Sequence, residues 1–154
     1  MSERTPEACM QRFREVCASR GLRVTPQRTE VYREVACTHE HPDADLVLTN
    51  VRQRIPNISR DTIYRILYWL EDQGLISRVQ VSSDRLRFDS NAESHHHFVC
   101  SECGTIRDFA SEEADSLRVP DEVRQWGEIR ERHLQVRGVC RDCLGKRKRG
   151  TSGR

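Results

Sequence analysis

The fold is decided by residues 59–89, which read SRDTIYRILYWLEDQGLISRVQVSSDRLRFD. In the first half of this stretch, four apolar residues recur at helical spacing: Ile63, Ile66, Leu67 and Leu70. Gly74 ends that pattern, because glycine commonly terminates helices. Beyond Gly74, two short runs alternate apolar and polar residues around a polar turn, with arginines on the polar side. The stretch therefore predicts a helix followed directly by a β-hairpin.

Three more helices are predicted upstream of this stretch. The first spans about residues 6–19, the second begins at the Thr25 cap followed by Pro26, and the third runs from Asp43 to Pro56. The last three helices and the hairpin together predict a winged helix, in which the final helix enters the major groove of DNA. The alternative is a generic helical domain whose hairpin only caps the core.

The composition favours two small domains over one large domain. Of the 154 residues, 36% are hydrophobic and 32% are charged, so a small second domain needs a staple besides its apolar core. The segment 90–94 reads as a linker. We therefore expect a winged-helix domain at 1–90, a second domain at 91–145 and a basic disordered tail at 146–154.

The second domain is expected to be a small α/β unit. Short strands are predicted near 95–100, 105–109 and 132–139. Helical turns are predicted between the last two strands, with Trp126 on their core face.

The compartment is inferred from what the sequence lacks. It shows no secretory leader and no apolar run near the ~20 residues of a membrane span, so a cytoplasmic protein with no membrane partner is expected. In that compartment the seven cysteines are better interpreted as metal ligands than as disulfides.

Two C-x-x-C pairs are the strongest chemical signal in the sequence. They are Cys100 with Cys103 and Cys140 with Cys143, and each pair can form a tight knuckle around one ion. Four thiolates make the tetrahedral ligand set of a closed structural Zn²⁺ site, which would stabilise a domain with a small core. The competing interpretation is disulfide or redox use of the pairs.

Three consecutive histidines indicate a second site. Residues 95–97 lie on a predicted strand, so the first and third histidines point to one face. Asp89, Asp108 and His41 would complete a nitrogen and oxygen ligand set suited to iron, manganese or zinc. The alternative is a polar surface strand that binds nothing.

Six motifs occur in order along the chain. They are RVTPQR (23–28), HPDA (41–44), SRDTIYR (59–65), LRFD (86–89), HHHFVCSECG (95–104) and GVCRDC (138–143). This set resembles the ferric uptake regulator family of bacterial repressors, from about Leu22 to Cys143. The resemblance implies an α+β homodimer, with an N-terminal winged helix-turn-helix domain and a small dimerisation domain stapled by structural Zn²⁺. It also implies a regulatory Fe²⁺ or Mn²⁺ that selects the form able to bind operator DNA, held by His41, Asp89, His95, His97 and Asp108.

Two positions indicate the branch of the family. Asp89 and Asp108 match its peroxide-sensing branch, whereas iron regulators more often have glutamate there. The resemblance then implies that peroxide oxidises His41 or His95 and releases the repressor. An iron-responsive or other metal-responsive regulator without peroxide sensing is the alternative. An accessory metal site of the iron regulators is not expected, because its positions hold Ser94, His96 and Arg132.

The DNA contacts are expected on the helix that starts at Ser59 and on residues 23–28. The candidates are Arg23, Arg28, Arg60, Thr62, Tyr64 and Arg65. Tyr64 and Arg65 match family contacts, and the two earlier arginines would reach phosphates. The alternative is that Tyr64 packs inside the domain and the arginines are solvated.

Two other functions are compatible with a cysteine-rich and histidine-rich sequence, and both are disfavoured. A zinc-dependent hydrolase or deaminase is disfavoured because the H-x-E and P-C-x-x-C motifs of deaminases are absent, so no enzymatic activity is expected. A zinc-ribbon interaction module without a DNA role is disfavoured by the predicted winged helix. Double-stranded DNA and a second copy of the chain are the expected partners, with peroxide as the only small-molecule signal.

Overall fold

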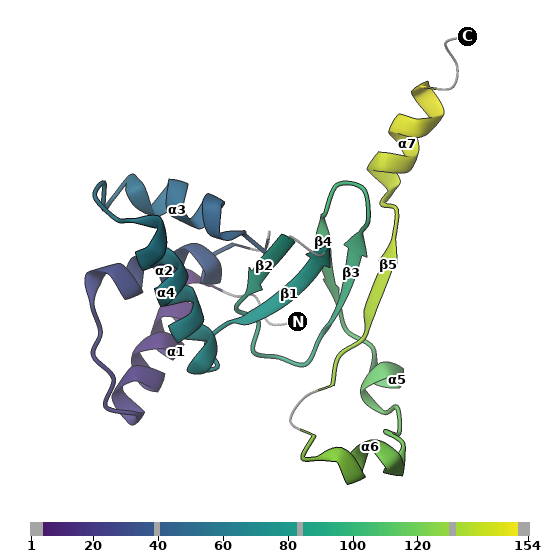
Figure 1. The fold of residues 1–154 in the computed structure, drawn as a ribbon, viewed down its shortest axis with the longest axis horizontal. Coiled ribbons are helices and arrows are strands. Elements are labelled where there is room, and N and C mark those ends of the chain that lie inside the picture. The colour runs from purple at the N-terminus through teal and green to yellow at the C-terminus, as the bar shows by residue number, and fades with distance from the viewer. Residues whose placement is uncertain (1–4, 39–40, 83–84, 130–131, 151–154) are drawn as a thin grey trace. The chain divides into compact units, whose positions relative to one another are not determined.

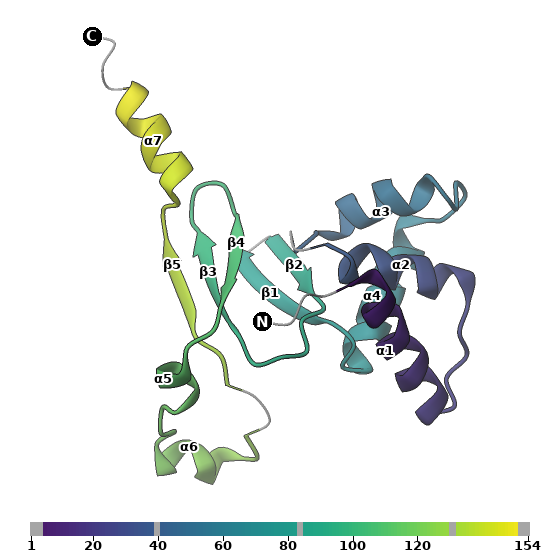
Figure 2. The same ribbon diagram turned by 180° about the vertical axis from the view of Figure 1, so that it is seen from behind.

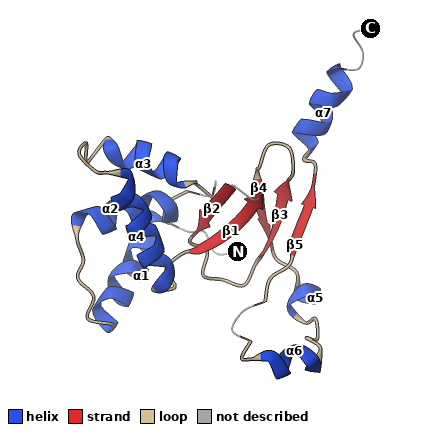
Figure 3. Ribbon diagram, in the orientation of Figure 1, coloured by secondary structure: helices blue, strands red, loops and turns tan. Residues whose placement is uncertain are grey.

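The structure is a computed structural model that describes residues 5–38, 41–82, 85–129 and 132–150. The chain divides into two compact units, Met1–Ala92 and Glu93–Arg154. Helices dominate the first unit and a sheet organises the second, which confirms the expected α+β class (Figures 1 and 3).

The first unit contains four helices and a two-stranded sheet. The elements are α1 (Pro6–Ser19), α2 (Pro26–Ala36), α3 (Ala44–Arg52), α4 (Arg60–Asp72), β1 (Ser77–Ser82) and β2 (Arg85–Asp89). Each helix begins at a residue whose side chain accepts a hydrogen bond from a backbone N–H of the first turn, and these caps are Thr5, Thr25, Asp43 and Ser59. Such caps satisfy donors that the helix leaves without a partner. The predicted starts of the second, third and fourth helices are therefore confirmed.

The core of the first unit is built from the apolar stripes of its helices. The four stripe residues of α4 are all buried: Ile63, Ile66, Leu67 and Leu70. Phe13 of α1 stacks on Tyr32 of α2, with ring centroids 4.9 Å apart. Burial of this apolar surface is the dominant stabilising contribution.

The hairpin follows α4 as predicted. Strands β1 and β2 pair antiparallel, and Ser77 lies opposite Asp89. Residues 83–84 of the predicted turn lie outside the described residues. Asp89 is the last residue of β2, so the pairing places it beside the start of β1.

The second unit is a three-stranded sheet with helical segments at its ends. The elements are β3 (His96–Cys100), β4 (Ile106–Phe109), α5 (Glu112–Asp115), α6 (Asp121–Trp126), β5 (Gln135–Gly138) and α7 (Arg141–Gly150). Strand β3 lies in the middle, antiparallel to β4 and parallel to β5, as the views from both sides show (Figures 1 and 2).

Two expectations for the second unit need correction. Trp126 is 74% exposed and not part of a core, because α5 and α6 are short helices that bury no residue. The chain from residue 146 was expected to be disordered, but α7 continues to Gly150. Lysine and arginine are good helix formers, so a helix that starts at the Cys140–Cys143 knuckle extends into the basic run.

No helix among the described residues is long and apolar enough to cross a membrane.

Candidate metal centres and DNA-facing helix

The four predicted zinc ligands come together in the second unit. The Sγ atoms of Cys100, Cys103, Cys140 and Cys143 all lie within 4.8 Å of one another. Cys100 is the last residue of β3 and Cys103 follows in the next turn, where Gly104 turns the chain at a positive φ of 72°. The second pair flanks the start of α7, and the Sγ atoms of Cys103 and Cys140 are 3.7 Å apart.

The electrostatics of this thiol cluster suit a bound cation. Backbone N–H groups of Cys103 and Cys140 donate to the Cys100 sulfur and lower its pKa to about 6. The pKa of Cys143 is raised to about 12, chiefly by its hydrogen bond to Cys140 and by burial. A cation bound among the four sulfur atoms would favour the thiolate form of each of them. A soft divalent ion with tetrahedral preference, such as Zn²⁺, fits this donor set.

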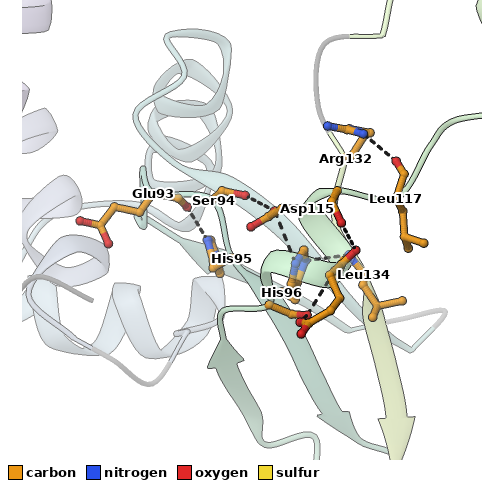
Figure 4. Close-up of polar contacts among 12 residues, drawn as sticks. Glu93, Ser94, His95, His96, Asp115, Leu117, Arg132 and Leu134 are labelled. Atoms are coloured by element: carbon orange, nitrogen blue, oxygen red, sulfur yellow. Dashed lines mark hydrogen bonds and ion pairs between the residues drawn. The ribbon is translucent and has the colours of Figure 1, made fainter.

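Three of the predicted regulatory ligands converge in the second unit. The Nδ1 atom of His95 lies 2.8 Å from the carbonyl oxygen of Glu93 (Figure 4). A carbonyl only accepts, so Nδ1 carries the proton and the lone pair of His95 is on Nε2. That Nε2 lies 2.9 Å from Nε2 of His97, which in turn lies 3.6 Å from Oδ1 of Asp108. The strand register places Asp108 directly opposite His97, so β3 and β4 present these ligands side by side.

The remaining two predicted regulatory ligands meet in the first unit. The Nε2 atom of His41 lies 3.7 Å from Oδ2 of Asp89. The backbone N–H of Phe88 donates to the Pro42 carbonyl at 3.0 Å, which ties the segment after His41 to β2. His41 has a positive φ of 47°, a conformation that few residues other than glycine adopt. The predicted regulatory residues thus form two groups, one in each unit.

The middle histidine lies on the opposite face of β3 and has different partners. His96 is 1% exposed, and its Nδ1 accepts a hydrogen bond from the backbone N–H of Leu134 at 3.1 Å. Its Nε2 lies 3.6 Å from Oδ1 of Asp115, which also accepts from Ser94 at 2.7 Å (Figure 4). Arg132 does not contact His96 in this network and instead donates to the backbone carbonyl of Leu117 at 2.8 Å (Figure 4).

These contacts do not fit an accessory metal site. The Nδ1 lone pair of His96 is already used, so Nε2 carries the proton and offers no lone pair to an ion. Asp115 could not be predicted as a partner of His96, because nothing in its sequence spacing signals that α5 packs near β3.

The candidate DNA contacts of α4 differ in exposure. Arg60 and Arg65 are exposed, whereas Thr62 and Tyr64 are half-buried. Arg60 forms an ion pair with Asp45 at 2.8 Å, an exposed contact of small energy that another anion can displace.

The two earlier candidate arginines are placed differently from each other. Arg23 is exposed. The guanidinium of Arg28 lies 3.9 Å from the ring centroid of Trp69, and Arg28 also donates to the carbonyl of Arg23 at 2.7 Å. Arg28 therefore supports the segment that carries Arg23 through contacts within the domain.

Comparisons with known proteins agree with this arrangement. The ferric uptake regulator family matches residues 19–137. Over 124 residues the chain is 32% identical to the peroxide-responsive repressor PerR of Staphylococcus epidermidis. The match covers 80% of this chain and 82% of the relative. The Helicobacter pylori ferric uptake regulator superposes with a TM-score of 0.73 at 27% identity, covering 94% of this chain and 97% of the other. The Campylobacter jejuni peroxide stress regulator superposes with a TM-score of 0.63 at 25% identity, covering 87% and 98%.

These matches extend over most of the chain, and the family consists of transcriptional regulators, not enzymes. The chain therefore belongs to the ferric uptake regulator family of metal-responsive regulators.

Proposed function

We propose that this chain is a metal-dependent, DNA-binding transcriptional repressor that senses peroxide through iron-catalysed oxidation of His41 or His95. The observation that carries this proposal is the convergence of His95 and His97, whose Nε2 atoms are 2.9 Å apart, beside Asp108. The likeness to the staphylococcal peroxide-responsive repressors supports it.

Two ions are assigned to the two clusters. Structural Zn²⁺ is held by the four cysteine thiolates. Regulatory Fe²⁺ or Mn²⁺ is held by His41, Asp89, His95, His97 and Asp108, a nitrogen and oxygen set suited to these harder ions. An ion that binds one conformation of the regulator more tightly than another would favour that conformation.

Peroxide sensing would depend on the oxidation of a histidine that binds the regulatory ion. Ferrous iron at this site would lend the electrons that cleave the oxygen–oxygen bond of peroxide and would recover them from the imidazole. Overall, an imidazole C–H and H₂O₂ become an oxidised imidazole and water, so the peptide gains one oxygen atom. In His95 the hydrogen bond to Glu93 fixes the ring, and the carbon between its two nitrogens is bonded directly to the ligating Nε2. That carbon therefore lies beside any oxidant formed at the ion.

The partners are double-stranded operator DNA and a second copy of the chain. Helix α4 would read the major groove through Arg60, Thr62, Tyr64 and Arg65, with Arg23 on a phosphate and Arg28 behind it. The second unit exposes large apolar side chains that a homodimer would cover: Leu117, Trp126, Ile129, Leu134, Val136 and Leu144.

The test is a DNA-binding assay on anaerobic, zinc-loaded protein that carries either Fe²⁺ or Mn²⁺. Both forms should bind operator DNA. One equivalent of peroxide should abolish binding of the iron form and add one oxygen atom to the peptide that contains His41 or His95. The manganese form should resist peroxide, because Mn²⁺ does not readily give up the electron.

Iron-loaded protein that keeps its DNA affinity and unmodified histidines under peroxide would contradict peroxide sensing. The second candidate, an iron-responsive or other metal-responsive regulator, would then stand. It is favoured by the TM-score of 0.73 to the H. pylori ferric uptake regulator.

A further inference from the structure

Arg12 connects three distant parts of the first unit. It lies on α1, outside the residues 19–137 that match the family. Its Nη2 donates to the carbonyl of Gly74 at 2.9 Å, beyond the end of α4. Its Nη1 donates to the carbonyl of Ser90 at 3.1 Å and approaches that of Leu75 at 3.5 Å. One guanidinium thus joins α1 and the end of α4 to the residue that follows β2.

The contact with Ser90 matters because of its neighbour. Asp89 precedes Ser90 and faces His41, with Nε2 and Oδ2 3.7 Å apart. The other oxygen of Asp89 accepts from the backbone N–H of Asn91 at 2.8 Å. The orientation of the Asp89 carboxylate therefore depends on where the backbone of residues 90–91 lies.

Ser90 is held from two sides. Its hydroxyl donates to the carbonyl of Val35 on α2 at 3.4 Å, and its own carbonyl accepts from Arg12. The bond from Arg12 is the stronger of the two, because its donor is charged and the site is partly buried. Of these contacts, it is the one that fixes the peptide unit leading into Asn91.

We propose that Arg12 is a positioning residue for the regulatory metal. It holds the backbone of residues 90–91 so that Asp89 presents its carboxylate beside His41. This inference rests on the proposed metal site. Residues that orient a ligand commonly change metal affinity about 10-fold to 100-fold when they are removed.

Arg20, at the end of α1, provides a matched control. The Nη1 of Arg20, the C-terminal cap of α1, donates to the backbone carbonyl of Gln73 at 2.9 Å and to its side-chain oxygen at 3.2 Å. Arg20 thus ties α1 to the same end of α4 as Arg12 does, and its contacts are with Gln73, not with Ser90. Loss of Arg20 weakens the same packing and leaves Asp89 held.

The experiment measures Mn²⁺ affinity by titration of the zinc-loaded, full-length protein. We expect Arg12→Ala to weaken Mn²⁺ binding about tenfold and Arg20→Ala to change it less than about twofold. The Mn²⁺ affinity of Arg12→Lys should fall between those of Arg12→Ala and wild type. A lysine keeps the positive charge, but its single ammonium group cannot bind both carbonyls at once. At saturating Mn²⁺ all three variants should regain wild-type DNA binding.

A second measurement does not depend on the metal. The amide hydrogen of Asn91 should exchange faster in Arg12→Ala than in Arg20→Ala, because its bond to Asp89 loosens. Equal Mn²⁺ affinity in the two variants would overturn the positioning role. Unchanged Mn²⁺ affinity in Asp89→Ala would instead overturn the metal site itself, and the role of Arg12 would fall with it.

Discussion

His95 shows how one backbone contact decides what a side chain can bind. Its Nδ1 proton is committed to the Glu93 carbonyl, so Nε2 is directed toward His97 as a base. Asp89 is committed in a similar way through the N–H of Asn91. At both proposed ligands a backbone group two residues away fixes the orientation, and one chemical group remains for a metal.

The length of the side chain at position 89 tests the sensing chemistry. We expect Asp89→Glu to keep Mn²⁺-dependent DNA binding but to lose most histidine oxidation, because a longer carboxylate can take a second bond to the ion and close the position that peroxide needs. Peptide mass analysis after one equivalent of peroxide measures the outcome. Asp45→Glu, at an exposed aspartate on α3, is the control and should oxidise like wild type. Equal histidine oxidation in both variants would contradict the use of Asp89 to assign the chain to the peroxide-sensing branch of the family.

The pKa of Cys100 predicts how zinc binding depends on pH. That pKa is lowered from 9.0 to about 6, so the stabilisation from this thiolate is complete above pH about 9 and is lost as pH falls through about 6. We expect the protein to keep its zinc at pH 7 to 8 and to release it progressively below pH about 6. A chromogenic zinc chelator measures the release. Zinc loss that is complete already at pH 7 would contradict the lowered pKa.

At the scale of elements, the helices were predictable and the surfaces of the second unit were not. The capped starts at Thr25, Asp43 and Ser59 are local signals that lie within a few residues of what they specify. Trp126 was wrongly placed in a core, because its six-residue helix contains only two apolar residues, Val123 and Trp126, too few to define a buried face.

The polar network behind β3 could not be predicted either. His96 joins Asp115 and Leu134, which are distant in sequence and follow no period. Arg12 reaches Ser90 across 78 positions. Contacts of this kind depend on how the helices and strands pack, which periodicity does not encode.

Helix α4 provides a test of the proposed DNA interface. Arg65 is exposed and lies outside the buried stripe, so Arg65→Ala should leave folding, metal content and dimerisation intact. Loss of a base contact should weaken operator binding by ~1 to 3 kcal/mol, whereas loss of a phosphate contact should lower the salt slope by about one. Gel shifts at several salt concentrations distinguish these outcomes.

The matched control for α4 is Arg14→Ala, at an exposed arginine of α1, which should bind operator DNA like wild type. If Arg65→Ala also matches wild type in affinity and salt slope, then α4 does not dock as proposed.

At the scale of the whole molecule, the second unit depends on its thiol cluster. Cys100→Ser should release about one zinc ion per chain and abolish dimerisation, because three thiolates do not hold a closed tetrahedral site and the unit has little apolar core. Metal analysis and sedimentation measure both losses. Cys37→Ser, at an exposed cysteine outside the cluster, should remain a zinc-loaded dimer. A zinc-loaded dimer of Cys100→Ser would refute the structural zinc site.

Strand β3 is only five residues long, yet both clusters share it. His97 lies near its start and Cys100 is its last residue, so in the proposed assignment this one strand carries a ligand of each ion. Zinc and the regulatory metal would then both be required for DNA binding, so the loss of either ion alone would be enough to abolish it. If both ions bind as proposed, a cell starved of zinc would lose repression even when iron is plentiful and peroxide is absent. The regulator would thus report zinc status without a dedicated zinc sensor.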